Sequence, residues 1–403
     1  MAVNYWLNRQ QTEVAQVKTF AITADSSGNT AVWTFTMTLD DGSTATVTYT
    51  EDGSPTTTEI ATGLYNAWNA STHPAISRIT ATNPVAGTVV LTADTAGVPF
   101  SVALSDSDDG THTETNTTAN VGNNDYGTAG NWSLNAVPAS TNDVVISAPA
   151  SGGECTAIKY GLNQSAVDIA TFRVTPDYNA DIGRVEDGRV FYLRIDPDTV
   201  DYRSASNFAA LDIGSANISP YIECNGFPST GRHALYIKGS NIATLEVKKG
   251  NVGVAVQTGD TATVATILCA FLSNAQGDVQ LKIGSGVTLT TLTQSGGQCD
   301  LGCAATTVSV SPDGVLTTSG TGAITTLNLN GTAYPNSTGT ITTINLYAGV
   351  LDFRRDRSGR TVTTLNILPR EQQGPTVYNT AAITFTNRPV MPTDVGTFRW
   401  TMA

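Results

Sequence analysis

The segment Ile324-Thr325-Thr326-Leu327-Asn328-Leu329 decides the expected fold, because it returns almost unchanged twice further along the chain. The two close copies are Ile341-Thr342-Thr343-Ile344-Asn345-Leu346 and Val362-Thr363-Thr364-Leu365-Asn366-Ile367. Each copy ends in alternating apolar and polar side chains, and this period of two is typical of a strand with one buried face. A short strand that recurs in this way predicts a chain that winds into coils stacked on one another.

Looser copies of the segment lie upstream. From Ile242 onward, successive copies begin 22, 25, 16, 19, 17 and 21 residues apart. Repetition at about 20 residues is the mark of a solenoid, in which every copy takes the same place in its own coil. The looser copies are Ile169–Val174, Ile242–Val247, Val264–Cys269, Leu289–Gln294 and Ala305–Val310.

A second kind of short strand, bounded by glycine, lies between the copies. One coil is therefore expected to hold two or three strands joined by tight turns, and stacked coils share one apolar core. The alternative is an antiparallel sandwich of Thr-rich strands. Near-identical strands favour the solenoid, because they suit equivalent places in stacked coils. The intervening strands are Gly253–Val256, Asp278–Ile283, Gly314–Leu316 and Gly349–Phe353.

Composition supports an all-β chain and excludes two classes of partner. The 403 residues carry a net charge of −13, and only 14 % of them are charged. Abundant Thr favours strands, and Gly favours turns. An acidic chain is unsuited to sequence-independent nucleic-acid binding or to anionic membranes, so we expect no nucleic acid and no membrane among its partners. We find no secretory signal and no apolar run of transmembrane length.

The cysteines do not predict a metal site or a cofactor. There are five, Cys155, Cys224, Cys269, Cys299 and Cys303, and we expect reduced thiols in the core or at turns. Cys299 and Cys303 have no histidine or second cysteine pair nearby in the sequence. The acidic stretch 106–110 fails the spacing of a calcium loop and is interpreted as solvated.

Five segments are expected along the chain. Residues 17–120 predict a β-rich module covered by one helix, Thr57–Ala70, on which Ile60, Leu64 and Trp68 share a face. The helix is expected to be capped by Thr57 or Thr58. The other segments are a docking arm (1–16), a polar connector with a solenoid cap (121–150), the solenoid (151–368) and a final cap or subunit contact (369–403).

Two groups of side chains are candidates for contact with a partner. Tyr5, Trp6 and Leu7 are apolar anchors in an otherwise polar N-terminal arm. The second group is the one basic cluster of the chain, between two predicted coils, where it is expected to protrude and meet an acidic partner or another copy of the chain. Its members are Arg354, Arg355, Arg357 and Arg360.

Catalytic residues are not predicted. Paired carboxylates could cleave polysaccharide on such a scaffold, but most acidic residues of the repeats adjoin glycine at turns, where Asp is favoured for turn geometry. No nucleophile motif surrounds His73, His112 or His233. We therefore expect no enzyme. The acidic candidates are Glu246, Asp260, Asp278, Asp300, Asp313, Asp352 and Asp356.

Nearly the whole chain resembles a family of tailed-bacteriophage structural proteins. The resemblance rests on the order of several motifs rather than on any one of them. They are Met1–Gln16 with Trp6-Leu7, Leu64–Ser71, Leu91–Phe100, Thr118–Gly122 and Asn131-Trp132-Ser133, followed by the coils. The resemblance implies a virion component and transfers no catalytic residue.

The function that this resemblance implies is a capsid decoration or cement protein. It would brace the head shell from the particle surface after assembly in the host cytoplasm, with the major capsid protein and copies of itself, as a homotrimer, for partners. A tail spike or tail fibre that binds or cleaves host glycan is the alternative. A cellular adhesin would need export, for which the N-terminus offers no signal.

Overall fold

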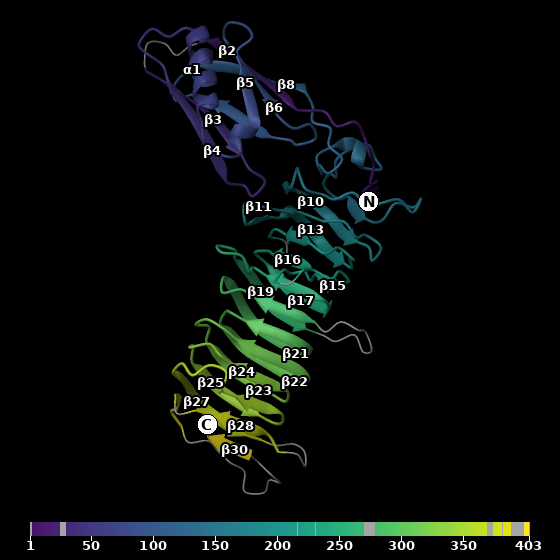
Figure 1. Cartoon of the computed structure of the whole chain (residues 1–403), viewed down its shortest axis with the longest axis vertical. Helices are drawn as coiled ribbons and strands as arrows, with labels where there is room; N and C mark the ends of the chain where they lie inside the picture. The colour runs from purple at the N-terminus through teal and green to yellow at the C-terminus, as the bar shows by residue number, and fades with distance from the viewer. Residues whose placement is uncertain are drawn as a thin grey trace. The chain divides into compact units, whose positions relative to one another are not determined.

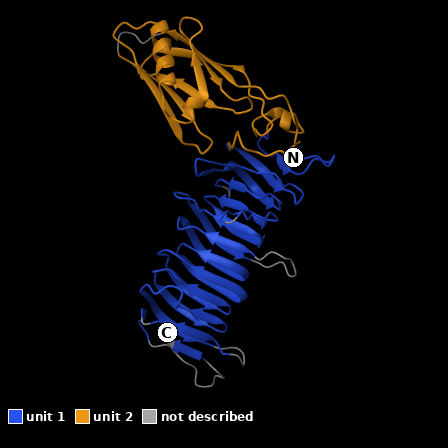
Figure 2. Ribbon diagram, viewed as in Figure 1, with its two compact units in different colours: residues 1–5, 138–155, 164–403 blue, residues 6–137, 156–163 orange. Residues whose placement is uncertain are grey.

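The computed structural model describes residues 2–24, 30–215, 217–229, 231–269, 279–368, 374–380, 382–387 and 399–402. These residues are rich in β-strand and contain one α-helix, so the all-β prediction is confirmed. The chain divides into two compact units (Figure 2). Unit 1 comprises residues 1–5, 138–155 and 164–403, and unit 2 comprises residues 6–137 and 156–163.

Unit 2 contains two antiparallel sheets and the helix α1 (Figure 1). One sheet has the strand order β5-β6-β2-β8 and the other β4-β3-β7. The strands are β2 (Val17–Ala24), β3 (Val32–Thr38), β4 (Thr44–Thr50), β5 (Ile79–Thr82), β6 (Thr88–Ala93), β7 (Ser101–Ser105) and β8 (Thr111–Thr118). Two 3₁₀ turns, η1 (Ile76–Arg78) and η2 (Ala129–Asn131), complete the unit.

The helix α1 (Thr57–Asn69) forms where it was predicted. Its predicted face, Ile60, Leu64 and Trp68, is buried in the core that the two sheets share with it. The predicted cap was wrong by one residue, because the Oγ1 atom of Thr56 accepts a hydrogen bond from the backbone N–H of Glu59 at 3.2 Å. A threonine in extended conformation before the first turn satisfies a backbone donor that the helix leaves free.

Unit 1 is built from parallel strands that stack along the chain (Figure 1). Its hydrogen-bond connections join them into one large sheet that closes on itself. A separate antiparallel hairpin, β11 (Arg184–Glu186) and β12 (Arg189–Phe191), lies apart from it. The early strands are β1 (Val3–Tyr5), β9 (Asp143–Ile146), β10 (Asn163–Val174), β13 (Leu193–Tyr202), β14 (Ala209–Asp212), β15 (Tyr221–Glu223), β16 (Leu235–Lys238), β17 (Ile242–Lys249), β18 (Asn251–Val254) and β19 (Ala262–Cys269).

The later strands of unit 1 hold the clear repeats. From β13 onward, a strand commonly pairs in parallel with the strand two places further along the chain. These strands are β20 (Gln280–Ile283), β21 (Val287–Leu301), β22 (Ala305–Thr318), β23 (Ile324–Leu329), β24 (Thr332–Pro335), β25 (Ile341–Leu346), β26 (Val350–Asp352), β27 (Arg360–Ile367), β28 (Thr376–Asn379), β29 (Ile383–Phe385) and β30 (Arg399–Met402).

The sequence copies lie side by side in one register. Ile324 pairs with Ile341, which pairs in turn with Val362, so the first residues of three copies are neighbours. The same register extends upstream through the looser copies to β17. Equivalent sequence positions are therefore equivalent positions in space.

One column of apolar side chains runs through seven of these strands. Every member is fully buried, and each pairs with the next along the column. Burying one such side chain contributes about 1.5–3 kcal/mol, so the column is a main source of stability. Its members are Leu245, Ile267, Leu292, Val308, Leu327, Ile344 and Leu365.

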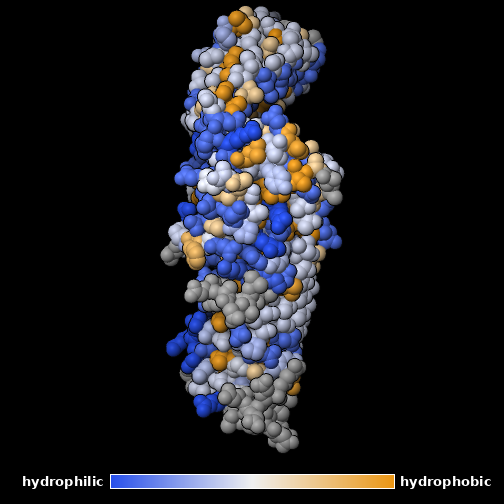
Figure 3. All heavy atoms as spheres, turned by 90° about the vertical axis from the view of Figure 1, so that its right-hand side faces the viewer, coloured by the Kyte–Doolittle hydropathy of each residue, from blue (hydrophilic) through white to orange (hydrophobic). Residues whose placement is uncertain are grey.

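The partly exposed positions beside this column are small and polar. Asn345 donates from Nδ2 to Oδ1 of Asn328 at 2.9 Å, and Asn366 donates to Asn345 at the same distance. Threonines of six successive pairs share a neighbouring column, from Thr244 to Thr364. In the lower half of Figure 3, hydrophobic residues are few and separated.

Glycine permits the tight corners between strands. Gly349 has a φ of +76°, and a Cβ atom there would lie 1.9 Å from the carbonyl oxygen of Gly331. No other residue fits both the left-handed backbone and this close approach to the preceding corner. This bears out the role expected of glycine at the turns.

The segment after β27 is described only in part. Residues 369–373, 381 and 388–398 lie outside the described residues, and so does Asp278, the first residue of the expected strand Asp278–Ile283. The end of that expected strand is β20. The described strands β28 and β30 pair in parallel, with Thr376 opposite Arg399. The stacking that the repeats begin therefore continues into the predicted terminal segment.

Candidate functional site: the arginine loop of unit 1

The basic cluster lies at the connection between β26 and β27, which we define as the arginine loop, residues 352–360, counting the last residue of β26 and the first of β27. Phe353 anchors the loop, since its side chain is fully buried and its backbone N–H donates to the carbonyl oxygen of Tyr378 at 3.0 Å. Its ring also packs edge-on against Phe385, with 6.5 Å between ring centroids. The loop therefore starts from a fixed point on the strands.

Arg354 is held by a carboxylate and by an aromatic ring. It donates from Nε and Nη2 to the two oxygens of Asp352, at 3.0 and 2.9 Å. Its guanidinium carbon lies 3.7 Å from the ring centroid of Tyr378, which pairs in register with Asp352. The hydrogen bonds from Arg354 lower the pKa of Asp352. This bidentate geometry is the one that guanidinium and carboxylate groups favour.

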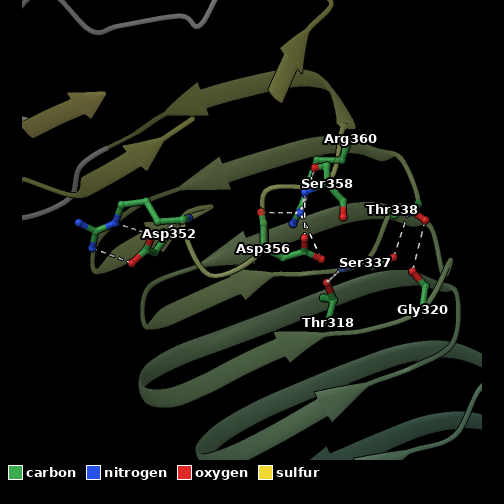
Figure 4. A network of polar contacts seen from close by, with 10 residues as sticks. Thr318, Gly320, Ser337, Thr338, Asp352, Asp356, Ser358 and Arg360 are labelled. Carbon is green, nitrogen blue, oxygen red and sulfur yellow. Dashed lines mark hydrogen bonds and ion pairs between the residues drawn. The ribbon is translucent and has the colours of Figure 1, made fainter. Parts of the chain in front are cut away.

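Arg360 does not protrude, which corrects the expectation for this residue. It is the first residue of β27, its side chain is almost wholly buried, and Nη2 donates to the carbonyl oxygens of Asp356 and Ser358 at 2.8 and 3.2 Å (Figure 4). The Asp356 carboxylate lies 3.6 Å away. Burial lowers the pKa of the Arg360 guanidinium. Arg360 therefore ties the end of the loop to its middle.

Hydroxyl groups close the corners of the preceding strands, near the arginine loop (Figure 4). The backbone N–H of Ser337 donates to Oγ1 of Thr318 at 2.9 Å, and its Oγ donates to the carbonyl of Gly322 at 2.8 Å. Thr338 donates to the carbonyl of Gly320 at 3.4 Å. These bonds satisfy backbone groups that the turns would otherwise leave unpaired.

Arg354, Arg355 and Arg357 are all exposed, and Arg354 is the one that Asp352 holds. The Arg355 guanidinium carbon lies 3.3 Å from the ring centroid of Tyr334, on β24. Within the described part of the chain, neither Arg355 nor Arg357 forms a salt bridge. These two side chains are consequently the members of the cluster that a partner can reach most directly.

The N-terminal anchors are divided between the two units. Tyr5 is 45 % exposed on β1. Trp6 is buried in unit 2, where its Nε1 donates to Oγ1 of Thr156 at 3.0 Å and its ring meets that of Trp132 at 5.2 Å. Leu7 is half-buried, and its N–H donates to the carbonyl of Asn131. The first residues are thus part of the fold, and Tyr5 is the most exposed of the three anchors.

A second polar cluster, which the sequence did not predict, lies on three neighbouring strands. Arg194, Asp212 and Lys238 are in register on β13, β14 and β16. Lys238 also lies 2.9 Å from Asp260, which accepts a hydrogen bond from the Tyr192 hydroxyl. Burial raises the pKa of Asp212, and the nearby Lys238 opposes that effect. The positive charges of Arg194 and Lys238 therefore balance the negative charges of the two aspartates in this cluster.

The other acidic candidates are dispersed, and most have a partner. Glu246 pairs with Lys248 at 2.5 Å, and Asp300 accepts a hydrogen bond from Ser319 at 2.8 Å. Asp356 accepts one from the backbone of Ser358. Asp313 is exposed on β22. Asp260, by contrast, shares Lys238 with the unpredicted Asp212.

The cysteines contribute to the core of unit 1. Cys224, Cys269, Cys299 and Cys303 are buried, Cys155 is half-buried, and all five are free thiols. Burial raises the pKa of Cys269 to about 12 and that of Cys303 to about 11. In the described ranges, no three His, Cys, Asp or Glu side chains are placed to share a metal ion.

The comparisons with known proteins identify no relative. No family model, curated protein or solved structure matches this chain. Of the described helices, none combines the length and the apolar character needed to cross a membrane.

Replacing Asp352 with asparagine is expected to lower the melting temperature at pH 7. Because the folded-state pKa of Asp352 is lowered, its pairing stabilises the fold above the ordinary carboxyl pKa of about 3.9 and is lost as the pH falls through the folded value. The difference between Asp352→Asn and the native chain should therefore vanish in strong acid. Thermal melts across pH, with the exposed Asp313→Asn as control, measure it. A difference in melting temperature that is independent of pH would contradict the stabilising role of the Asp352 carboxylate.

Proposed function

We propose that this chain is a structural component of a tailed-bacteriophage particle, a capsid decoration protein whose parallel strands form a β-solenoid. The observation that carries the proposal is the common register of the sequence copies, with a buried apolar column and small polar side chains outside it. Such an array forms a stiff scaffold from repeated nearest-neighbour contacts. The order of phage-like motifs in the sequence supports its place on a particle.

A solenoid accounts for the pairing better than a barrel of hairpins. In an up-and-down barrel, strands adjacent in the chain pair antiparallel. Here β23 pairs in parallel with β25 and β25 with β27, while β24 pairs with β26 and β26 with β28. Two interleaved series of parallel pairs are what a chain of two-strand coils produces.

The decoration role follows from what such a scaffold can do at a shell. Bound copies that contact more than one shell subunit add buried area, and the free energy of binding must be overcome before the shell opens. The exposed positions of the repeats, mostly Thr, Ser and Asn, suit display to solvent. Tyr5 offers an exposed aromatic side chain of the kind that contributes strongly to protein interfaces.

Tyr5→Ala is expected to weaken binding to phage heads that lack the native protein by at least tenfold. Deleting residues 1–16 would be a poor test, because it removes β1 and the buried Trp6. Co-sedimentation of purified protein with heads measures the affinity and the copy number. Val85→Ala, which removes another exposed apolar side chain, is the control. Failure of the native chain to bind heads would overturn the decoration role.

The alternative role is a tail spike or fibre that cleaves host glycan. The observation in its favour is the half-buried Asp212 beside Lys238 and Asp260. If the alternative holds, incubation with host-envelope polysaccharide releases reducing sugar, and Asp212→Asn abolishes the release. The decoration role predicts no release by either chain.

A further inference from the structure

The arginine loop carries a positive charge on an acidic chain. Residues 352–360 contain four arginines and two aspartates, a net charge of +2, whereas the whole chain has −13, which leaves −15 for the remainder. Two of the four arginines are engaged within the loop, Arg354 by Asp352 and Arg360 by backbone carbonyls. The excess charge is thus concentrated at Arg355 and Arg357, which are both exposed.

The geometry of the loop favours carboxylates over sugar rings as its target. A sugar ring is commonly held against an open aromatic face, but guanidinium groups already lie 3.3 Å from the ring centroid of Tyr334 and 3.7 Å from that of Tyr378. The stacking also restrains Arg355 before any partner arrives, and this lowers the entropy lost on binding. A restrained guanidinium with free N–H groups is suited to a carboxylate.

We propose that the arginine loop binds an acidic surface on a second copy of this chain. The inference deepens the proposed function and rests on it, since that function brings copies together on one particle. Charge complementarity selects the occupant, because every further copy brings a surplus of 15 negative charges outside its own loop.

The same electrostatics selects the symmetry of the contact. An interface between two copies related by a twofold axis through the loop would place +2 against +2, which is repulsive. A heterologous contact sets the loop of one copy against a different, acidic surface of the next, and such contacts close into rings. The threefold assembly expected from the phage resemblance is the smallest of these rings.

Sedimentation equilibrium of the full chain tests the proposal. The native chain should self-associate at about 50 mM salt, and its dissociation constant should rise at least tenfold at about 500 mM, where charges are more strongly screened. The double variant Arg355→Glu with Arg357→Glu should weaken association at least tenfold at low salt. The matched control, Arg232→Glu with Lys282→Glu, makes the same charge change at two exposed sites on other parts of unit 1 and should not.

Three results would overturn the proposal: a native chain that is monomeric at both salt concentrations, a loop variant that associates as well as the native chain, or a control that loses association equally. Head-binding measurements on the same proteins separate this proposal from the decoration role. A monomeric chain that still covers phage heads retains the decoration role and loses self-association through the loop. A chain that self-associates but does not bind phage heads retains self-association through the loop and loses the decoration role.

Discussion

Replacing Ile344 with alanine is expected to lower the free energy of unfolding by about 2–5 kcal/mol. Ile344 is fully buried, and it pairs with Leu327 on one neighbouring strand and with Leu365 on the other. Three removed carbon atoms leave a cavity that the adjoining strands cannot fill, because they are fixed by hydrogen bonds on both sides. Denaturant unfolding followed by far-ultraviolet circular dichroism measures the change.

A neighbouring exposed residue supplies the control for this substitution. Thr325→Ala, on the adjacent strand β23, removes an exposed side chain and should change the stability by no more than about 0.5 kcal/mol. If Ile344→Ala lowers the free energy of unfolding no more than Thr325→Ala does, the strands do not share the buried column, and the stacked arrangement is wrong.

The strands and their register were the most predictable part of the fold. Near-identical segments such as Ile324–Leu329 and Ile341–Leu346 carry their buried residues at the same offsets, so one register buries all of them at once. The helix was predictable for a similar local reason, since the apolar residues Ile60, Leu64 and Trp68 are spaced one helical turn apart. Each of these patterns is contained in a short segment of the chain.

Features that depend on distant contacts were missed. The strand β8 was not predicted because its side chains show no apolar alternation, yet it pairs with β2 along most of its length. Trp6 is buried against Thr156, which is 150 residues away. No local sequence pattern near Trp6 or Thr156 predicts this contact. The sequence therefore offers no basis for preferring a buried Trp6 over an exposed one.

The sequence predicted the four arginines as one cluster, but the structure places them in different surroundings. All four arginines read alike in the sequence, but Arg360 begins a strand and is buried, whereas Arg355 and Arg357 are exposed. Asp212 was overlooked because no motif surrounds it. Only the parallel register, which places it between Arg194 and Lys238, shows its surroundings.

The central claim is that the repeats are interchangeable coils of a solenoid, and removing one whole copy tests it most directly. Deleting residues 324–340 joins Ala323 to Ile341, so that Ala305 can pair with Ile341 as it now pairs with Ile324. The second strand keeps its register in the same way, with Val315 opposite Val350. The account therefore predicts a folded chain that is slightly less stable than the native one.

Deleting only residues 324–331 is the matched control, because it removes one strand of a coil and places every later strand on the wrong side. That chain should lose cooperative unfolding and most of its strand signal in far-ultraviolet circular dichroism. The measurement is the unfolding transition of the two deletions side by side. A cooperative transition for the 17-residue deletion alone supports stacked coils. Loss of the transition in both, as expected if the removed strands close a barrel, would contradict them.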